Sequence, residues 1–513
     1  MNFPMIRYVL SAVLRVEGLL FALPLITAAV YREWAVAPVY LVLLVGCVAV
    51  GQLFSKKPKD MALYQKDGYV IVAFAWILLS LVGALPFVLT GEIRGYIDAL
   101  FEITSGFTTT GSSILKHVEV LTHASLFWRS FSHWIGGMGV LVFILMLMPG
   151  EGGTHMNLMR AESPGPNVSK FVPHVRGTAA ILYKLYIGIT GVQIVLLLLF
   201  GMPLFDTLCI TFGTAGTGGF GILSASCADY TAAQQWIVAI FMILFGMNFS
   251  FYYLIFYQRK VRPAFRMQEI RGYLAVIGAA IVFITAQLMR QTDFYRHFLD
   301  ALRAATFQVG SIITTTGYST ANFDLWPAAS KWILVLLMFI GACAGSTGGG
   351  IKVSRVIILL KTIKKELFTL THPRAVRKTM FDGHVVPHEV LRAINVFLAA
   401  YLMIFCLSVF AISLDGFSLE TNFTAVAATI NNIGPGLAGV GPAKNFAAFS
   451  AFSKLVLTFD MLVGRLELFP VLMLFMPATW RKSWARDGKT QKYRQPWLPV
   501  FLCPDDAFIF PRR

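Results

Sequence analysis

Long apolar runs alternate with short polar connections along the chain. Of the 513 residues, 57% are hydrophobic and 13% are charged, whereas a soluble domain has roughly a quarter of its residues charged. A run of about 20 apolar residues is long enough to cross a bilayer as a helix. The pattern therefore predicts an all-α integral membrane protein with ten transmembrane helices. The predicted spans cover residues 9–31, 35–54, 68–91, 124–149, 179–204, 234–258, 269–290, 329–360, 389–413 and 452–477.

Lysine and arginine gather in every second connection between these spans. Basic loops of this kind lie on the cytoplasmic side of a membrane, so we expect these loops and both termini to be cytoplasmic. The loops also account for the net charge of +17, and nucleic-acid binding is not needed to explain it. The basic connections contain Lys56, Lys57, Lys59 and Lys66; Arg160, Lys170 and Arg176; Arg259, Lys260, Arg262, Arg266 and Arg271; Lys361, Lys364, Lys365, Arg374, Arg377 and Lys378; and Arg481, Lys482, Arg486, Lys489, Lys492 and Arg494.

The outward connections share one pattern: an acidic residue, a short apolar stretch, and a polar run that ends at a glycine. The four copies are "IDALFEITSGFTTTGSSIL", "LFDTLCITFGTAGTGGFGIL", "FLDALRAATFQVGSIITTTGYST" and "SLETNFTAVAATINNIGPGL". Their acidic residues are Asp98, Asp206, Asp300 and Glu420, and their glycines are Gly111, Gly218, Gly317 and Gly434. The spacing predicts an internal repeat of about one hundred residues, longer than the repeats of solenoids.

We therefore expect two leading helices and four units of helix, re-entrant half-helix, polar loop and helix, arranged with fourfold pseudo-symmetry. The predicted divisions are 1–60 for the leading helices, 61–155, 156–262, 263–380 (with a broken second helix) and 381–480 for the four pore repeats, and 481–513 for a cytoplasmic tail.

Such loops have restricted physical options. Irregular backbone at membrane depth must be buried in protein or line a water-filled cavity. Glycine permits positive φ, which lets successive carbonyls point to one side, and rings of carbonyls replace the hydration shell of potassium in selectivity filters. The alternative is that each loop is only a capped turn between helices, but four copies in register favour a filter.

These motifs resemble the Trk/Ktr/HKT superfamily of potassium transporters, and within it the bacterial TrkH family, which has two extra leading helices. The resemblance covers nearly the whole chain and includes "SGFTTTG", "GTGGFGIL", "TTTGYST", "INNIGPG", "HWIGGMGV" and "GRLELFPVL". It implies a potassium-binding filter made of Thr109, Thr110 and Gly111; Gly216, Thr217 and Gly218; Thr315, Thr316 and Gly317; and Asn432, Ile433 and Gly434.

The resemblance carries further expectations. The fourth segment departs most from the family pattern, so the filter should be asymmetric at Asn432 and Ile433. Plant relatives that transport sodium have a serine at the first filter position, so Gly111 favours potassium. The resemblance also implies the inner (plasma) membrane of a bacterium, a homodimer, and a cytoplasmic TrkA-like regulatory ring that binds ATP, ADP or NAD. Potassium is then the substrate, and the chain itself has no cofactor.

The eighth span contains a break, "GSTGGGIK", at Gly345–Lys352. Four glycines in six residues weaken a helix by about 1 kcal/mol each relative to alanine. The segment is not a phosphate-binding loop, because Ile351 precedes Lys352 and no Ser or Thr follows. In the family, the loop at this place obstructs the pore below the filter. The predicted gate residues are Gly345, Ser346, Thr347, Gly348, Gly349 and Gly350.

Arg465 is predicted at the middle of the tenth span, where an arginine needs an interior partner or a pathway. One interpretation is a structural ion pair with Glu467 or Asp460. The resemblance gives the other: the corresponding family arginine lies in the permeation path and holds the gate loop. Arg129, near a predicted helix end, is expected to reach water.

The predicted function is potassium uptake through a channel-like pore with a carbonyl filter and an intramembrane gate. The alternatives are a symporter coupled to protons or sodium, for which Glu102 is a candidate carboxylate, and the potassium-translocating subunit of a P-type ATPase. No nucleophile–base arrangement predicts an enzyme. The six cysteines have no metal-ligand spacing. His384 and His388 are four residues apart, but Pro387 intervenes and the order is not HExxH, so the predicted filter is the one metal site. The basic tail is expected to contact the partner or anionic lipid.

Overall fold

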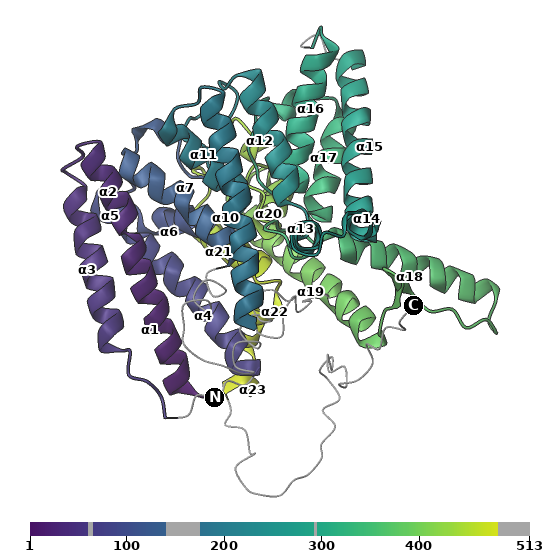
Figure 1. Cartoon of the computed structure of the whole chain (residues 1–513), viewed down its shortest axis with the longest axis horizontal. Coiled ribbons are helices and arrows are strands. Elements are labelled where there is room, and N and C mark those ends of the chain that lie inside the picture. Colours follow the sequence, from purple (N-terminus) through teal and green to yellow (C-terminus); the bar gives the residue numbers. More distant parts are fainter. Residues whose placement is uncertain (60–64, 140–174, 292–294, 481–513) are drawn as a thin grey trace, which may run out of the picture.

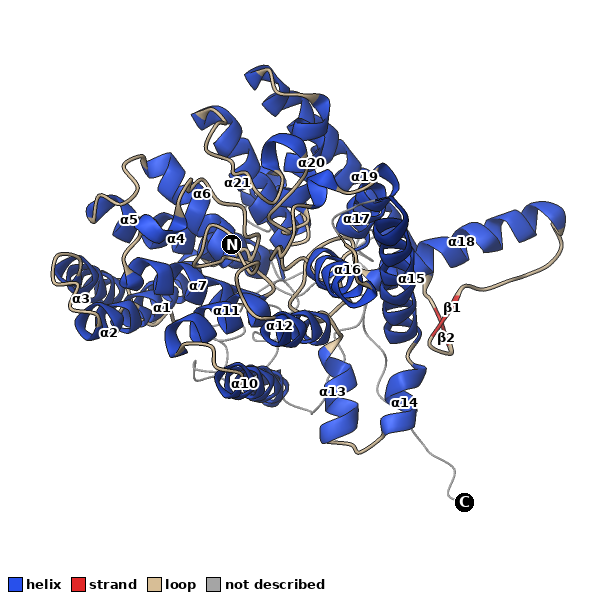
Figure 2. Cartoon of the chain, turned by 90° about the horizontal axis from the view of Figure 1, so that it is seen from above, coloured by secondary structure: helices blue, strands red, loops and turns tan. Residues whose placement is uncertain are grey.

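The computed structural model describes residues 1–59, 65–139, 175–291 and 295–480. This part of the chain is almost entirely helical (Figures 1 and 2). Its two strands, β1 (Met380–Phe381) and β2 (His384–Val385), form a small antiparallel hairpin. The N-terminus and the last described helix, α23 (Pro477–Trp480), lie at the same end of the molecule in Figure 1.

The leading segment folds as α1 (Phe3–Leu20), α2 (Ala22–Val30) and α3 (Ala37–Leu53). The Asn2 side chain accepts a hydrogen bond from the N–H of Met5, which caps the start of α1. These three helices form one flank of the molecule (Figure 2).

After the leading helices, one succession occurs four times: a long helix, a short helix, a polar turn and a second helix. The long first helices are α4 (Gln65–Gly83, extended by α5, Leu85–Leu89), α10 (Val175–Leu199), α15 (Gln268–Gln291) and α19 (His388–Ile412). The short helices are α6 (Tyr96–Phe107), α11 (Leu204–Gly216), α16 (Phe298–Ile313) and α20 (Leu419–Ile430). The second helices are α7 (His123–Met138), α12 (Ala232–Phe245), α17 (Ala328–Ile340) and α21 (Ala451–Arg465).

The short helices have 12 to 16 residues, and at 1.5 Å per residue they are too short to cross an apolar layer of about 30 Å. As the sequence predicts, each has its acidic residue in the first turn, where the positive end of the helix dipole favours a carboxylate. The remaining helical elements are α13 (Phe249–Phe256), α14 (Val261–Arg266), α18 (Val353–Thr371), α22 (Phe469–Leu472) and the 3-10 turns Val118–Val120, Phe323–Leu325, Ser413–Asp415, Ala438–Val440 and Met473–Phe475.

Five helices of the described part are long and apolar enough to cross a membrane, and six if one bent pair counts as a single span. They are Phe3–Val30, Lys66–Leu89, Ala180–Leu199, Gln268–Gln291 and His388–Asp415, and the bent pair is Ala232–Phe245 with Phe249–Phe256. These segments confirm a multi-helix membrane architecture near the corresponding predicted spans. The ten-helix topology and the repeat boundaries stay predictions, and the span 124–149 and the tail 481–513 fall partly or wholly outside the described residues.

Two predicted spans are interrupted where the sequence analysis expected continuous helices. The span 234–258 bends by 93° between α12 and α13, and the span 452–477 breaks after Arg465. Glu467 and Leu468 there have φ of 53° and 70°, which a right-handed helix does not allow. The break in the eighth span was predicted, but it covers all of 341–352, between α17 and α18, and not only Gly345–Gly350.

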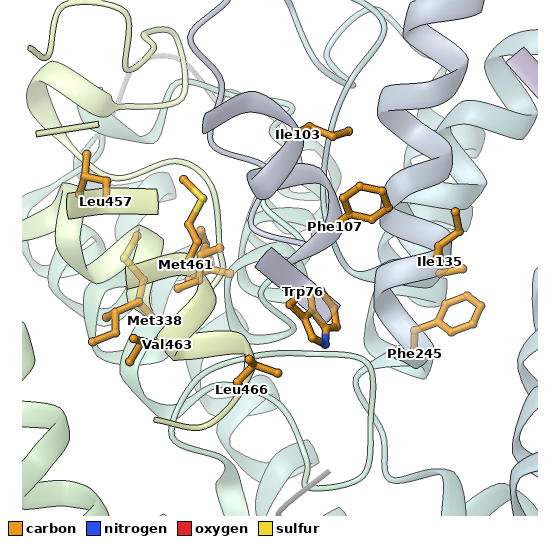
Figure 3. Packing of buried hydrophobic residues seen from close by; sticks show 14 of the residues in the cluster. Trp76, Ile103, Phe107, Ile135, Phe245, Met338, Leu457, Met461, Val463 and Leu466 are labelled. Carbon is orange, nitrogen blue, oxygen red and sulfur yellow. The ribbon is translucent and has the colours of Figure 1, made fainter. Parts of the chain in front are cut away.

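One contiguous buried cluster joins the four successions. Figure 3 shows apolar side chains of this cluster that come from elements far apart in the chain. Trp76 belongs to α4, Phe107 to α6, Phe245 to α12 and Met461 to α21. This packing holds the polar turns that follow the short helices at the centre of the molecule.

Candidate ion-conduction site

The turns after the four short helices have the same backbone conformation. Each contains a non-glycine residue in the left-handed region, followed two residues later by a glycine with positive φ. The first residues are Thr109 (56°), Thr217 (55°), Thr315 (60°) and Asn432 (56°). The glycines are Gly111 (79°), Gly219 (77°), Gly317 (85°) and Gly434 (102°). We call these three-residue stretches the filter segments.

The residue in the middle of each filter segment makes an equivalent hydrogen bond. Its N–H donates to the carbonyl oxygen five residues back in the preceding short helix, at 2.8 Å in every case. The pairs are Thr110 with Ser105, Gly218 with Gly213, Thr316 with Ser311, and Ile433 with Ala428. Conformation and hydrogen bonding therefore give one common register for the four segments.

This register corrects the second segment by one residue. The predicted segment is Gly216–Gly218, but Gly216 is the last residue of α11, and Gly219 has the positive φ that Gly111, Gly317 and Gly434 share. The motif "GTGG" ends in two adjacent glycines, and the prediction takes the first of them, Gly218. The backbone conformation distinguishes the two glycines. Gly219 has a positive φ, as Gly111 does, and is therefore its structural equivalent.

The four filter segments close into a ring. A Cβ atom added to Gly111 would clash with the carbonyl oxygen of Gly218, in the second segment. The same relation holds from each segment to the next and from the last back to the first. The further pairs are Gly219 with the oxygen of Thr316, Gly317 with that of Ile433, and Gly434 with that of Thr110. Each close approach requires a residue without a side chain, so the spacing of the ring depends on four glycines.

A pocket of about 170 Å³ opens onto the ring. Its lining includes Gly111, Gly219, Gly317 and Gly434, so all four segments reach it. The pocket lies at the glycine end of the segments, which is the end away from the short helices.

A buried ion pair supports the ring from behind. Glu102 in α6 and Arg129 in α7 lie 2.6 Å apart, with side chains 0% and 3% exposed. Glu102 also accepts hydrogen bonds from the N–H of Ile114 and the hydroxyl of Ser113, each at 2.9 Å. Arg129 donates to the carbonyl of Gly221 at 2.8 Å. The expectation that Arg129 reaches water is therefore wrong, because this arginine ties the first segment to the second.

His133, at 0% exposure, makes a second such tie. Its Nδ1 lies 2.7 Å from the carbonyl oxygen of Gly106, and its Nε2 accepts a hydrogen bond of 3.1 Å from the N–H of Phe220. A neutral imidazole with the proton on Nδ1 satisfies both contacts. The sequence motif "HWIGGMGV" drew attention to this residue, but its partners were not predictable from the motif.

Replacing His133 with leucine is expected to lower the free energy of unfolding by about 2 kcal/mol, because a buried carbonyl and a buried N–H lose their partner. Thermal unfolding of the purified protein in detergent measures the effect. His384→Leu, in the exposed strand β2, serves as the control and should change the stability little. Equal shifts for the two variants would contradict the bridging role of His133.

The loop 341–352 lies against the opposite end of the ring. The N–H of Gly349 donates to the hydroxyl of Thr315 at 2.6 Å. A Cβ at Gly348 or Gly349 would press on the carbonyl of Thr314 or Asn431, the last residue before the third or fourth segment. Among the predicted gate residues, Gly348 and Gly349 thus touch the ring, and we call 341–352 the gate loop.

Arg465 joins the gate loop to the ring. Its guanidinium donates to the carbonyl of Thr347 at 2.8 Å and to the hydroxyl of Thr109 at 3.2 Å. It also donates to the carbonyls of Gly136 and Gly137 at the end of α7. Arg465 is the last residue of α21 and not the middle of a continuous helix as predicted.

The two carboxylates considered as partners of Arg465 have other contacts. Glu467 forms an ion pair with Arg355, and Asp460 accepts a hydrogen bond of 2.7 Å from the hydroxyl of Ser408. Arg465 itself donates hydrogen bonds to the loop 341–352, to Thr109 and to the end of α7. Lys352, at the end of the loop, is buried and donates to the carbonyl of Gly348.

Comparisons with known proteins agree with this geometry. Residues 39–482 match the family model TrkH, described as a cation transport protein. The chain belongs to the TrkH family of cation transport proteins. The members of this family are membrane transporters and not enzymes, and this chain is therefore a membrane transport protein.

Individual TrkH-family proteins match over nearly their whole length. The chain is 36% identical to the Trk system potassium uptake protein TrkH of Salmonella typhimurium over 483 residues, which are 92% of this chain and 99% of that protein. It is 32% identical to the Trk system potassium uptake protein TrkG of Escherichia coli, over 89% of this chain and 94% of that protein. The crystal structure of the potassium transporter TrkH from Vibrio parahaemolyticus superposes with a TM-score of 0.84 at 32% identity, covering 94% of this chain and 100% of that one.

The side chains and carbonyls of the described residues bear on which ions the protein could bind. Among the described residues, no group of three or more His, Cys, Asp or Glu side chains could hold a metal ion. The oxygen atoms that the filter segments carry are backbone carbonyls, threonine hydroxyls and the amide oxygen of Asn432, which are hard ligands suited to an alkali cation.

Proposed function

We propose that this protein conducts potassium into the cell through the ring of filter segments. The observation that carries the proposal is the closed ring, in which each positive-φ glycine lies against the carbonyl of the next segment. Such a ring can replace the hydration shell of a dehydrated cation. The printed names of the relatives, potassium uptake proteins of the Trk system, support potassium as the cation.

The same proposal includes the topology. Four quasi-equivalent repeats surround the pathway, their short helices are re-entrant, and ten helices cross the inner membrane of a bacterium with both termini in the cytoplasm. The negative ends of the short helices then point at the cation, which they stabilise. A membrane potential drives entry with about 2.3 kcal/mol per charge for every 100 mV.

The gate loop and Arg465 close this pathway below the filter. The loop packs under the third and fourth segments, and the guanidinium adds a fixed positive charge beside Thr109. A like charge at a few ångströms in a medium of low dielectric repels an entering cation strongly. In this proposal the protein is a homodimer, and a cytoplasmic TrkA-like nucleotide-binding ring releases the loop, so that control by ATP, ADP or NAD comes from that ring.

A passive pathway fits the site better than a proton-coupled one. Glu102 was the candidate carboxylate for a proton relay, but Arg129, Ser113 and the N–H of Ile114 all donate to it. These donors engage both oxygens of the carboxylate and tie Glu102 to α7 and to the chain that follows the first segment. It instead acts as a support for the ring.

Uptake in cells that lack their own potassium transporters tests the function. We expect the full chain, expressed with a Trk regulatory partner, to restore growth at low potassium and to take up potassium in preference to sodium. Uptake should follow the membrane potential and should not depend on a proton or sodium gradient. No potassium uptake with the partner present, or uptake that stops when only the proton or sodium gradient is removed, would contradict the proposal.

A further inference from the structure

The gate loop is held from the side away from the pathway by residues that no motif singles out. The bend between α12 and α13 faces the loop: the N–H of Cys343 donates to the carbonyl of Gly246 at 3.1 Å, and the N–H of Phe249 donates to the carbonyl of Gly345 at 3.0 Å. The hydroxyl of Thr347 donates to the carbonyl of Phe245 at 3.2 Å. The loop of the third succession is therefore docked on the break in the second.

A buried carboxylate lies at the centre of this contact. Glu269, in the first turn of α15, is 3% exposed. One of its oxygens accepts a hydrogen bond of 2.7 Å from the N–H of Ala344 in the gate loop, and the other accepts one of 3.1 Å from the side-chain amide of Asn248. The remaining oxygen of Asn248 accepts from the N–H of Ser250 at 2.8 Å, which fixes the orientation of the amide.

The residue next to Glu269 faces a different surface. The N–H of Gln268 donates to the carboxylate of Asp382 in the β1–β2 hairpin at 2.7 Å, and its side chain accepts a hydrogen bond from Lys361 of α18. Lys361 also donates to the carbonyl of Met380 at 2.9 Å. The start of α15 thus contacts the gate loop through one residue and the hairpin and α18 through the preceding one. Both α18 and the hairpin project from the rest of the helices (Figure 2).

We propose that Glu269 and Asn248 form a latch that keeps the gate loop in its closed position. The proposal rests on the proposed function, because it assigns a positioning role to residues outside the pathway. Glu269 is a positioning residue: it acts through the N–H of Ala344 and touches no conducted ion. Movement of the hairpin would displace the start of α15 and pull the carboxylate from the loop. A donor left without its acceptor in a buried place destabilises the closed arrangement.

The polarity of the latch gives a sharp test. In Glu269→Gln an amide NH₂ faces the NH₂ of Asn248, and in Asn248→Asp two carboxylates face each other, so each single variant breaks the contact. The double variant restores one donor and one acceptor across it. Glu389→Gln is the matched control, because Glu389 is an exposed glutamate in the first turn of α19.

The measurement is flux of rubidium or potassium into liposomes that contain the purified full chain without any partner. We expect each single variant to raise this partner-free flux about tenfold, the change expected when a hydrogen bond to a charged group is lost. The double variant should return to the native value. The buried thiol of Cys343 in the gate loop provides a second readout: a water-soluble thiol reagent should modify it faster in the single variants and at the native rate in the double variant.

A variant that lacks Gly345–Gly350 tests the proposed pore independently of the latch. If this variant conducts while the single variants keep the native flux and the native rate of Cys343 modification, the latch is wrong and the proposed pore is retained. If neither this variant nor the native chain with its partner conducts, the proposed function and the latch are both wrong.

Discussion

Replacing Gly111 with serine is expected to reduce the preference for potassium over sodium by at least about tenfold. The new Cβ would clash with the carbonyl oxygen of Gly218 and would force a residue with a side chain to keep a φ of 79°. The left-handed conformation costs such a residue roughly 1–2 kcal/mol, and 1.4 kcal/mol corresponds to a factor of ten. Relief of the clash must displace the carbonyls of the ring, which set the distance to the ion.

Gly91→Ser separates the clash from the backbone strain. Gly91 has a φ of 78°, but a Cβ there would meet nothing within 4 Å. Parallel uptake of potassium, rubidium and sodium by the two variants measures the difference. Unchanged selectivity in Gly111→Ser, at an expression level equal to that of Gly91→Ser, would mean that the segments are structural turns and not a filter.

Much of this ring could be predicted from the sequence because its signals are local. "TTTG" occurs in the first and third segments and "NNIG" in the fourth, and Gly111, Gly317 and Gly434 all have the expected positive φ. The second segment was displaced by one residue because Gly218 and Gly219 are adjacent. The sequence does not distinguish the two glycines, but their conformations do. The N–H of Gly218 donates to the carbonyl of Gly213, and Gly219 has the positive φ.

One of the helix breaks could be predicted from the local sequence, and the break after Arg465 could not. The break in the eighth span was predictable because four glycines destabilise a helix. The break after Arg465 was not, because Glu467 and Leu468 adopt positive φ without being glycine. A tertiary contact holds that conformation, because Arg355, distant in sequence, pairs with Glu467. A local hydrogen bond of 2.8 Å from the N–H of Leu468 to the carbonyl of Val463 closes the turn.

Of the buried charged residues, Arg465 could be singled out from the sequence and Glu269 could not. Arg465 was noticed because an arginine in an apolar run is anomalous in any membrane helix. Glu269 is the first residue of a predicted span, beside a basic connection, where an acidic residue is not anomalous. Its importance comes from Asn248 and Ala344, which are distant in sequence. Such a constellation is visible only once the chain has folded.

Replacing Arg465 with glutamine is expected to raise partner-free potassium flux by more than about tenfold, because hydrogen bonds to a charged group contribute roughly 1.5–3 kcal/mol each. The guanidinium binds the gate-loop carbonyl of Thr347, the hydroxyl of Thr109 and two carbonyls at the end of α7. A glutamine amide is shorter and has fewer donors, and it removes the fixed charge from the pathway. Flux into liposomes measures the change.

Arg303→Gln is the control for loss of an arginine charge. Arg303 is paired with Asp300 at 3.0 Å on the surface of α16, where an ion pair contributes less than about 1 kcal/mol.

Arg465→Lys distinguishes charge from geometry, because an ammonium keeps the repulsion but cannot match the planar fork that reaches both the loop and α7. If Arg465→Lys stays closed, repulsion of the cation is the dominant effect. If it leaks like Arg465→Gln, the hydrogen bonds that fasten the loop dominate, and the gate is a mechanical closure. Native-like flux in both variants, with a loop-deleted protein that conducts, would contradict a role of Arg465 in the gate.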